Sequence, residues 1–164
     1  KNNMDNLFIS TISKTTISVE AKYLNNNIDR VLLTKLKDNV EGKCIKDGYV
    51  KKNSVKIIKR SAGVAQISGF NGSSLFHIMY SIDVCNPLEG HIIEVQALNI
   101  NKMGIFAGVP YEQNSPINVM IAKQHHIDNP EFDKIKENDI FKIKVIGKRY
   151  EYGDTSIQII GIIE

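Results

Sequence analysis

Few side chains in the sequence have the types and spacing that catalysis or metal binding requires. Cys44 and Cys85 are the two cysteines, and they lie far apart, without the C-x-x-C spacing of a zinc site. His125 and His126 are adjacent and have no third ligand at a familiar spacing. The sequence has no phosphate-binding loop, no H-E-x-x-H and no G-x-S-x-G elbow. We therefore expect a non-catalytic protein without a metal ion or cofactor, and two buried thiols.

Basic side chains are distributed unevenly and could contact a polyanion. Residues 1–86 carry 13 basic and 7 acidic side chains, which gives +6, whereas residues 87–164 carry 8 and 11, which gives −3. Seven of the basic residues lie between Lys43 and Arg60, where Asp47 is the one acidic residue. This segment could face nucleic acid or an acidic protein surface, although a solvated lysine face is the simpler explanation.

The first half of the chain predicts a small antiparallel sheet with one helix. Residues 6–13 and 15–21 are two runs of β-prone residues. A helix follows, because Leu24, Ile28, Leu32, Leu36 and Val40 recur every four residues, and Gly42 ends it. Further strands are expected over residues 43–45 and 49–60. Residues 76–85 are expected to form a strand, because their side chains alternate between two faces, with Phe76, Ile78, Tyr80, Ile82 and Val84 on one of them.

The second half predicts an all-β barrel. Asn86-Pro87 marks a boundary, so we expect two domains, residues 1–86 and 87–164. Strands are expected over residues 91–100, 105–109 and 117–122, followed by a polar connection over 123–137 and a hairpin over 139–150 and 155–163. Three strands, a longer crossover and a final hairpin follow the five-strand order of an oligonucleotide-binding (OB) fold. No apolar run reaches the roughly 20 residues that span a bilayer, which argues against a membrane role.

An OB barrel that binds single-stranded RNA needs aromatic faces for base stacking and cations for phosphates. Phe106 could stack on a base if it points outward, but Phe106 and Ile105 lie on opposite faces and only one can fill the core. Lys142 and Lys144 share a strand face, as they also would in an ordinary half-buried strand. The complete set of candidates is Lys102, Phe106, His125, Lys142, Lys144, Lys148 and Arg149.

Short motifs follow one another in an order that resembles a known family. They are Glu41-Gly42-Lys43-Cys44 with Gly48-Tyr49-Val50, the stretch from Gly63 to Gly72, Phe76 to Tyr80, Asn86-Pro87-Leu88-Glu89-Gly90, and Asn101 to Phe106. This order resembles the seventh-largest subunit of RNA polymerase II and its archaeal counterpart, E-prime. The resemblance runs from about Leu7 to Ile163. Each motif is weak alone, and their order carries the resemblance.

The resemblance implies a non-catalytic stalk subunit of a multisubunit DNA-dependent RNA polymerase. Its first domain would be a truncated RNP-like fold that docks on the core near the clamp, against the largest subunit and the small subunit beside the clamp. Its second domain would be an OB barrel of the S-one type that contacts nascent RNA during transcription. A smaller stalk partner usually binds alongside in that family.

Docking in a narrow pocket favours glycines, which allow close backbone approach, together with exposed apolar side chains. For Gly72 and Tyr49, a hairpin turn and a local core are equally good explanations. The candidate docking residues are Gly42, Gly48, Tyr49, Gly63, Val64, Ile67, Gly69, Phe70 and Gly72.

Two other functions compete with this interpretation. A free-standing OB-fold protein of translation or RNA processing would share residues 87–164 but would have no use for a docking domain. An enzyme whose site assembles only in three dimensions would need titratable groups that converge in one cleft. The abundance of Ile, Lys and Asn suggests an AT-rich genome, and a large DNA virus is our hypothesis for the source. The expected location is inside the cell wherever the polymerase acts, namely the nucleus or, for a virus, a cytoplasmic factory and the virion.

Overall fold

The computed structural model describes residues 7–25, 27–66, 72–112 and 114–164, and these form two compact units. The sheet–helix unit comprises residues 9–42 and 50–84. The barrel unit comprises residues up to Phe8, Lys43–Tyr49 and Cys85–Glu164. The predicted fold class is confirmed: an antiparallel sheet with one helix is followed by a closed five-stranded barrel. The division into a docking domain of residues 1–86 and an RNA-binding domain of residues 87–164 stays a prediction.

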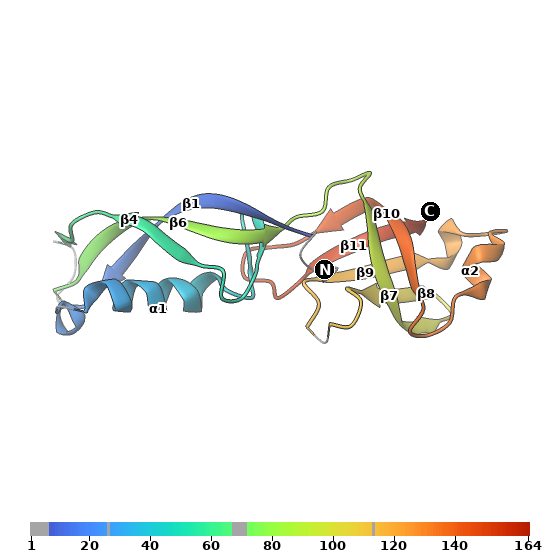
Figure 1. Ribbon diagram of the computed structural model, residues 1–164, viewed down its shortest axis with the longest axis horizontal. Helices are drawn as coiled ribbons and strands as arrows, with labels where there is room; N and C mark the ends of the chain where they lie inside the picture. Colours follow the sequence, from blue (N-terminus) through green and yellow to red (C-terminus); the bar gives the residue numbers. More distant parts are fainter. Residues whose placement is uncertain (1–6, 26, 67–71, 113) are drawn as a thin grey trace. The chain divides into compact units, whose positions relative to one another are not determined.

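The sheet–helix unit is built around the long strand β6. Its elements are β1 (Phe8–Val19), η1 (Ala21–Tyr23), α1 (Ile28–Val40), β4 (Lys56–Arg60), β5 (Val64–Ala65) and β6 (Ser74–Cys85). In this unit β1, β4 and β5 each pair with β6. Figure 1 shows α1 lying along one face of the sheet.

The core of this unit follows the two periodicities that the sequence predicts. In α1, Leu32, Leu36 and Val40 are buried, as their four-residue spacing requires. In β6, the side chains from Phe76 to Val84 that share one face are all buried, and those between them are half-buried or exposed. The helix therefore covers the apolar face of the sheet.

Two predicted strands differ from the structure. The first difference is at the start of the chain. Two strands are expected there, over residues 6–13 and 15–21, but the structure has a single strand, β1, from Phe8 to Val19. No turn residue interrupts this stretch, so the extended backbone continues through Lys14. The second is the strand expected over residues 49–60, which the structure divides into β3 (Gly48–Val50) and β4. A turn separates them, with Asn53 in the left-handed region at φ 62°.

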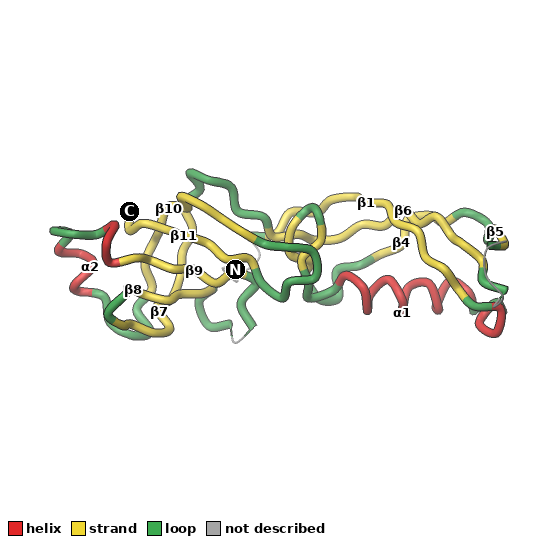
Figure 2. The backbone as a smooth tube through the Cα atoms, turned by 180° about the vertical axis from the view of Figure 1, so that it is seen from behind, coloured by secondary structure: helices red, strands yellow, loops and turns green. Residues whose placement is uncertain are grey.

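The barrel consists of β7 (Ile92–Asn101), β8 (Gly104–Gly108), β9 (Ile117–Ala122), β10 (Ile140–Arg149) and β11 (Ile157–Ile163). It closes in the order β10-β11-β9-β8-β7; β9 and β11 are parallel and the other pairs antiparallel. The connection from β9 to β10 contains η2 (Lys123–His125) and α2 (Pro130–Lys134), and Figure 2 shows it against the barrel. The interior is filled by inward side chains that alternate along the strands. They include Val95, Ala97, Ile105, Ala107, Val119, Ile121, Ile143, Val145, Ile157 and Ile159.

A short hairpin, β2 (Cys44–Ile45) and β3, also belongs to the barrel unit. The Cys44 N–H donates to the Asp154 carbonyl at 2.7 Å, and the Gly153 N–H donates to the Cys44 carbonyl at 2.8 Å. The Tyr150 hydroxyl donates to the Lys46 carbonyl at 3.0 Å. Cys44 and Tyr49 are therefore part of the barrel core cluster.

The two cysteines are buried free thiols, as expected. Burial raises the pKa of the Cys44 thiol to about 11 and that of the Cys85 thiol to about 12, because the thiolate loses its hydration. The described residues contain no group of three potential metal ligands. Among the helices of the described ranges, none is long and apolar enough to cross a membrane.

Candidate nucleic-acid interface

Phe106 lies on the outer surface of the barrel. Along β8 the side chains alternate, with Ile105 1% exposed and Phe106 41% exposed. Of the two orientations that the sequence leaves open, the structure has the outward one. An exposed aromatic face is what base stacking requires.

Pairing between strands extends Phe106 into a row of exposed and half-buried apolar side chains. Phe106 pairs with Met120 of β9, and Met120 pairs with Ile160 of β11. Directly paired residues point to the same side of a sheet, so Met120 and Ile160 lie beside Phe106 on the outer surface. We call Phe106, Met120 and Ile160 the outer row.

Sequence reasoning missed Met120 and Ile160. The run Ile157 to Ile163 has apolar residues at nearly every position, so its sequence does not show which of them face outward. Strand register was needed to place Ile160 next to Met120. The sequence did contain one signal for Met120. It alternates with the β-branched residues Val119 and Ile121, which the structure shows to be buried.

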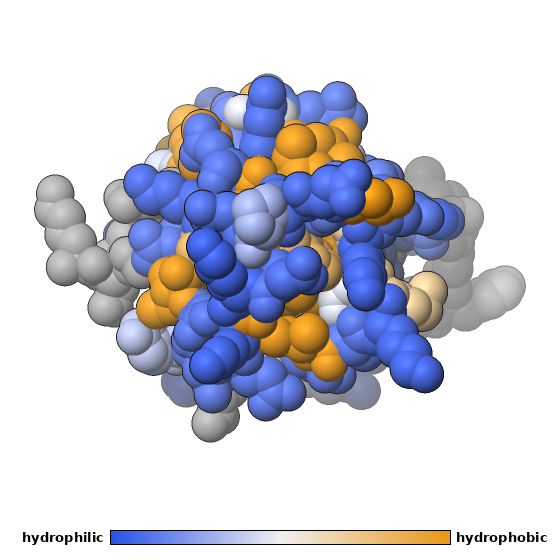
Figure 3. Space-filling view, turned by 90° about the vertical axis from the view of Figure 1, so that its right-hand side faces the viewer, coloured by the Kyte–Doolittle hydropathy of each residue, from blue (hydrophilic) through white to orange (hydrophobic). Residues whose placement is uncertain are grey.

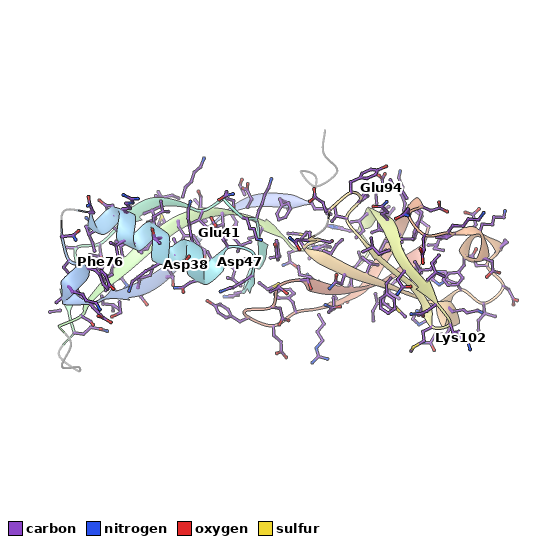
Figure 4. The ribbon with its side chains drawn as sticks, turned by 90° about the horizontal axis from the view of Figure 1, so that it is seen from below. Asp38, Glu41, Asp47, Phe76, Glu94 and Lys102 are labelled. Atoms are coloured by element: carbon purple, nitrogen blue, oxygen red, sulfur yellow. The ribbon has the colours of Figure 1, made fainter. Side chains whose placement is uncertain are left out.

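Lys102 is exposed at the tip of the β7–β8 hairpin. The Asn101 carboxamide oxygen accepts hydrogen bonds from the N–H groups of Met103, at 2.8 Å, and Gly104, at 3.2 Å, and these bonds fix the turn. Gly104 has φ 150°, and a Cβ atom there would lie 2.1 Å from the Ile121 carbonyl oxygen. Figure 4 shows Lys102 at this end of β7, separated along the strand from Glu94.

Lys142 and Lys144 are exposed on β10, but they do not lie in the outer row. Lys142 pairs with Glu94 of β7, and Lys144 pairs with Ile92 of β7 and Ile162 of β11. The carboxylate of Glu94 lies on the same side of the sheet as the Lys142 ammonium and offsets its field. Lys142 therefore offers a weaker attraction for phosphate than Lys144, whose paired neighbours are apolar.

Lys148 and Arg149 differ in how freely they could meet a ligand. The half-buried Lys148 ammonium donates to the Asn86 carboxamide oxygen, and the Asn86 amide donates to the Asp47 carbonyl at 3.1 Å. Arg149 is exposed and lies 3.8 Å from the Glu151 carboxylate, in a solvated ion pair. Lys148 therefore joins parts of its own unit, and Arg149 is the more accessible cation.

The two adjacent histidines have different environments. His125 is exposed in η2. His126 is buried, its Nδ1 lies 2.8 Å from the Ala122 carbonyl, and its Nε2 accepts the Ile163 N–H at 3.0 Å. Its ring also stacks on Phe132 at 5.1 Å. This pattern requires a neutral ring with the proton on Nδ1, so His126 serves the packing of the barrel.

Apolar side chains on the barrel side of the molecule form small separate patches. Figure 3 shows one such face, where orange side chains are interrupted by blue hydrophilic ones. Dispersed exposed apolar residues are normal for a protein surface.

The docking candidates fall in both units. In the sheet–helix unit, Val64 is 60% exposed in β5, Gly42 and Gly72 have positive φ, and a Cβ on Gly63 would lie 2.7 Å from the Phe76 ring. In the barrel unit, Tyr49 is 7% exposed, with its ring 6.3 Å from that of Phe8.

Gly48 also lies in the barrel unit, at φ 129°, and a Cβ there would meet the Cys85 carbonyl oxygen at 2.5 Å. This close approach accounts for glycine at the position. The candidates Ile67, Gly69 and Phe70 lie outside the described residues.

Curated proteins similar to this chain are subunits of RNA polymerases. The "DNA-directed RNA polymerase II subunit RPB7" of Glycine max is 26% identical over 173 residues, covering 96% of this chain and 93% of that protein. The corresponding subunit of Schizosaccharomyces pombe is 24% identical, covering 82% of this chain and 83% of its own length. The "Putative DNA-directed RNA polymerase subunit L376" of Acanthamoeba polyphaga mimivirus is 26% identical over 83% of this chain and 65% of its own. No family model matches the chain.

Proposed function

Because this chain is an RPB7-like RNA polymerase subunit, we propose that it docks on the polymerase core near the clamp and contacts nascent RNA during transcription. It is a non-catalytic subunit of the polymerase complex. The observation that carries the proposal is the extent of the similarity, which covers 96% of this chain and 93% of the soybean subunit. The similarity therefore extends over both units of the fold.

Docking is assigned to the sheet–helix unit, at the end where β5 pairs with β6. Val64 pairs with Leu75, yet its own side chain is exposed. An exposed Val in a short strand beside glycines is suited to enter a pocket on another protein. The partners are the largest subunit and the small subunit beside the clamp, with a smaller stalk subunit alongside.

RNA contact is assigned to the outer surface of β8 and β9 and to the β7–β8 turn. OB folds bind oligonucleotides on the face of their second and third strands and on adjacent loops. In this chain that face holds Phe106 and Met120, and the turn holds Lys102. Phe106 would stack on a base while Lys102 meets phosphate, and the exposed Arg149 and His125 lie on neighbouring elements of the barrel unit.

Replacement of Val64 by Asp tests the docking assignment. In cells or extracts that contain the cognate polymerase, the tagged variant should recover at least about tenfold less of the large polymerase subunits than the wild type does, because a buried charge would face the pocket. Ile58→Asp is the matched control, since Ile58 is also exposed in a strand of the same unit. Equal recovery of polymerase by wild type and Val64→Asp would contradict the assignment.

A further inference from the structure

The face of the sheet that points away from α1 carries its own set of side chains. In β6, His77, Met79, Ser81 and Asp83 alternate with the buried residues and therefore share this open face. Lys56 and Lys59 of β4 pair with Ser81 and Met79, so these two lysines point to the same side. Figure 1 shows α1 on the opposite side of the sheet.

Strand β1 supplies the other edge of the open face. The Ser10 hydroxyl donates to the Asp83 carboxylate at 2.7 Å, which places Ser10 on this face. Alternation then puts Ile12, Lys14 and Thr16 on it as well, in agreement with the burial of Ile17 and Val19 on the other side. Ile12 is 60% exposed, so it contributes little to the packing of its own unit.

Between these edges lies a groove of about 710 Å³. Residues of β1, β4 and β6 and of the segment that follows β4 line it, among them Lys14, Thr16, Lys59, Ser61, His77 and Met79. This volume lies within the range of roughly 300–1,000 Å³ that is usual for ligand sites. The groove therefore offers ammonium groups at its two edges and a polarisable thioether between them.

The charge of the open face is positive. Lys14, Lys56 and Lys59 are exposed on it, and Asp83, which accepts from Ser10, is the carboxylate on the β6 part of the face. Arg60 also lines the groove, but it forms an ion pair with Asp29 of α1, and its guanidinium lies 5.7 Å from the centre of the Phe76 ring. The cations that the described part of this face offers to a ligand are therefore the lysines, and they favour an anionic one.

The lining of the groove favours a peptide over a nucleic acid. Among the described residues that line it, the one aromatic ring is the His77 imidazole, a smaller platform for bases than Phe, Tyr or Trp. Met79 and the exposed Ile12 instead offer apolar contact next to the lysines, and methionine adapts readily to varied apolar partners. We propose that this open face is a binding site for an acidic peptide segment with interspersed apolar side chains, supplied by another protein.

Val64 pairs with Leu75 and so points to the same side of the sheet, but neither Val64 nor the outer row lines the groove. Peptide binding to the isolated chain is measured directly, so the test does not depend on docking or on RNA contact. The test uses the full chain and a fluorescently labelled synthetic peptide of alternating glutamate and leucine, with binding followed by anisotropy at low salt. The double variant Lys14→Glu/Lys59→Glu should weaken binding by at least about tenfold, because two attractions become repulsions.

The matched control is Arg30→Glu/Lys52→Glu, which makes the same change in net charge at two exposed residues of the same unit outside the groove. It should change the dissociation constant by less than about threefold, since screening limits distant charges. Equal weakening by the two double variants would overturn the proposal, because the attraction would then be general.

Two further comparisons define the ligand. Ile12→Ser should weaken binding of the glutamate–leucine peptide and leave binding of a polyglutamate peptide unchanged; an identical effect on both peptides would contradict the apolar contact. Oligouridine of the same net charge should bind more weakly than the glutamate–leucine peptide. Tighter oligouridine binding, lost in the Lys14→Glu/Lys59→Glu variant, would identify the face as a nucleic-acid surface and refute the peptide assignment. Circular dichroism of each variant verifies that the fold is retained.

Discussion

Single residues on the barrel surface differ in how much of their side chain is available to a ligand. Phe106 presents its ring to solvent, whereas Lys148 and His126 use their polar atoms within their own unit. The position of a residue in the sequence therefore does not show whether its side chain is available to bind a ligand. Hydrogen bonds within the chain decide which candidates are free to act.

Phe106→Ala should weaken binding of a single-stranded oligouridine by the full chain about 5- to 150-fold. This range corresponds to the loss of one stacked base, worth roughly 1–3 kcal/mol. Fluorescence anisotropy at low salt measures the change. Ile92→Ala serves as the control, because Ile92 is an exposed apolar residue of β7 outside the outer row. If Ile92→Ala lowered the affinity for oligouridine as much as Phe106→Ala does, base stacking on the Phe106 ring would be contradicted.

At the scale of elements, the barrel depends on tight turns and on the hairpin from the first half of the sequence. The β7–β8 turn requires glycine at position 104, where the backbone has a positive φ and approaches β9 closely. The β2–β3 hairpin brings Cys44 and Tyr49 into the barrel core. The turn requires a residue without a side chain at position 104, whereas the hairpin requires apolar side chains that can be buried.

Gly104→Ala should lower the free energy of unfolding by more than about 2 kcal/mol, because the new methyl group would overlap the Ile121 carbonyl oxygen. Chemical denaturation of the full chain measures the loss. Gly147→Ala is the matched control on β10, since a Cβ at that position meets nothing within 4 Å. A loss for Gly104→Ala no larger than that of the control would show that the turn can relax.

Buried thiols make stability fall at alkaline pH. The pKa of Cys44 is raised from 9.0 to about 11 and that of Cys85 from 9.0 to about 12, so the folded state holds both protons more tightly than the unfolded state does. Their contribution is constant below about pH 9 and is lost as the pH rises from there toward 12. Denaturation curves between pH 8 and about 11 should show this fall, and Cys44→Ala/Cys85→Ala should make it shallower. An unchanged slope in the double variant would contradict the thiol assignment.

At the scale of the whole molecule, charge is divided between the two halves of the sequence. Residues 87–164 carry a net charge of −3, although the candidate RNA surface lies among them. Phosphate contacts dominate non-specific affinity for nucleic acids, so the barrel alone has little long-range attraction for RNA. Tethering to a polymerase would supply the local concentration that intrinsic affinity lacks.

The full chain should therefore bind oligouridine weakly, with a dissociation constant above about 1 µM at physiological salt, and more weakly as salt increases. A titration at several salt concentrations measures both the affinity and the slope. Nanomolar binding at physiological salt would contradict the requirement for tethering.

Much of the fold could be predicted because its elements have clear periodicities. The buried faces of α1 and β6 follow from Leu32, Leu36 and Val40 and from the alternation after Phe76. The orientation of Phe106 could not be predicted, because alternation separates two faces without saying which one is inside. The outer row required strand register, which sequence does not contain for an apolar run such as β11.

The placement of the β2–β3 hairpin has a consequence for how the chain can be divided. Cys44 and Tyr49 belong to the barrel core, although both precede the first barrel strand, β7, in the sequence. A fragment that starts at Pro87 would lack these two side chains and the backbone bonds to Gly153 and Asp154. A fragment made to study the barrel alone should therefore include the β2–β3 hairpin, either in the same chain or as an added peptide. Cys44 and Tyr49 would then complete the core of the barrel.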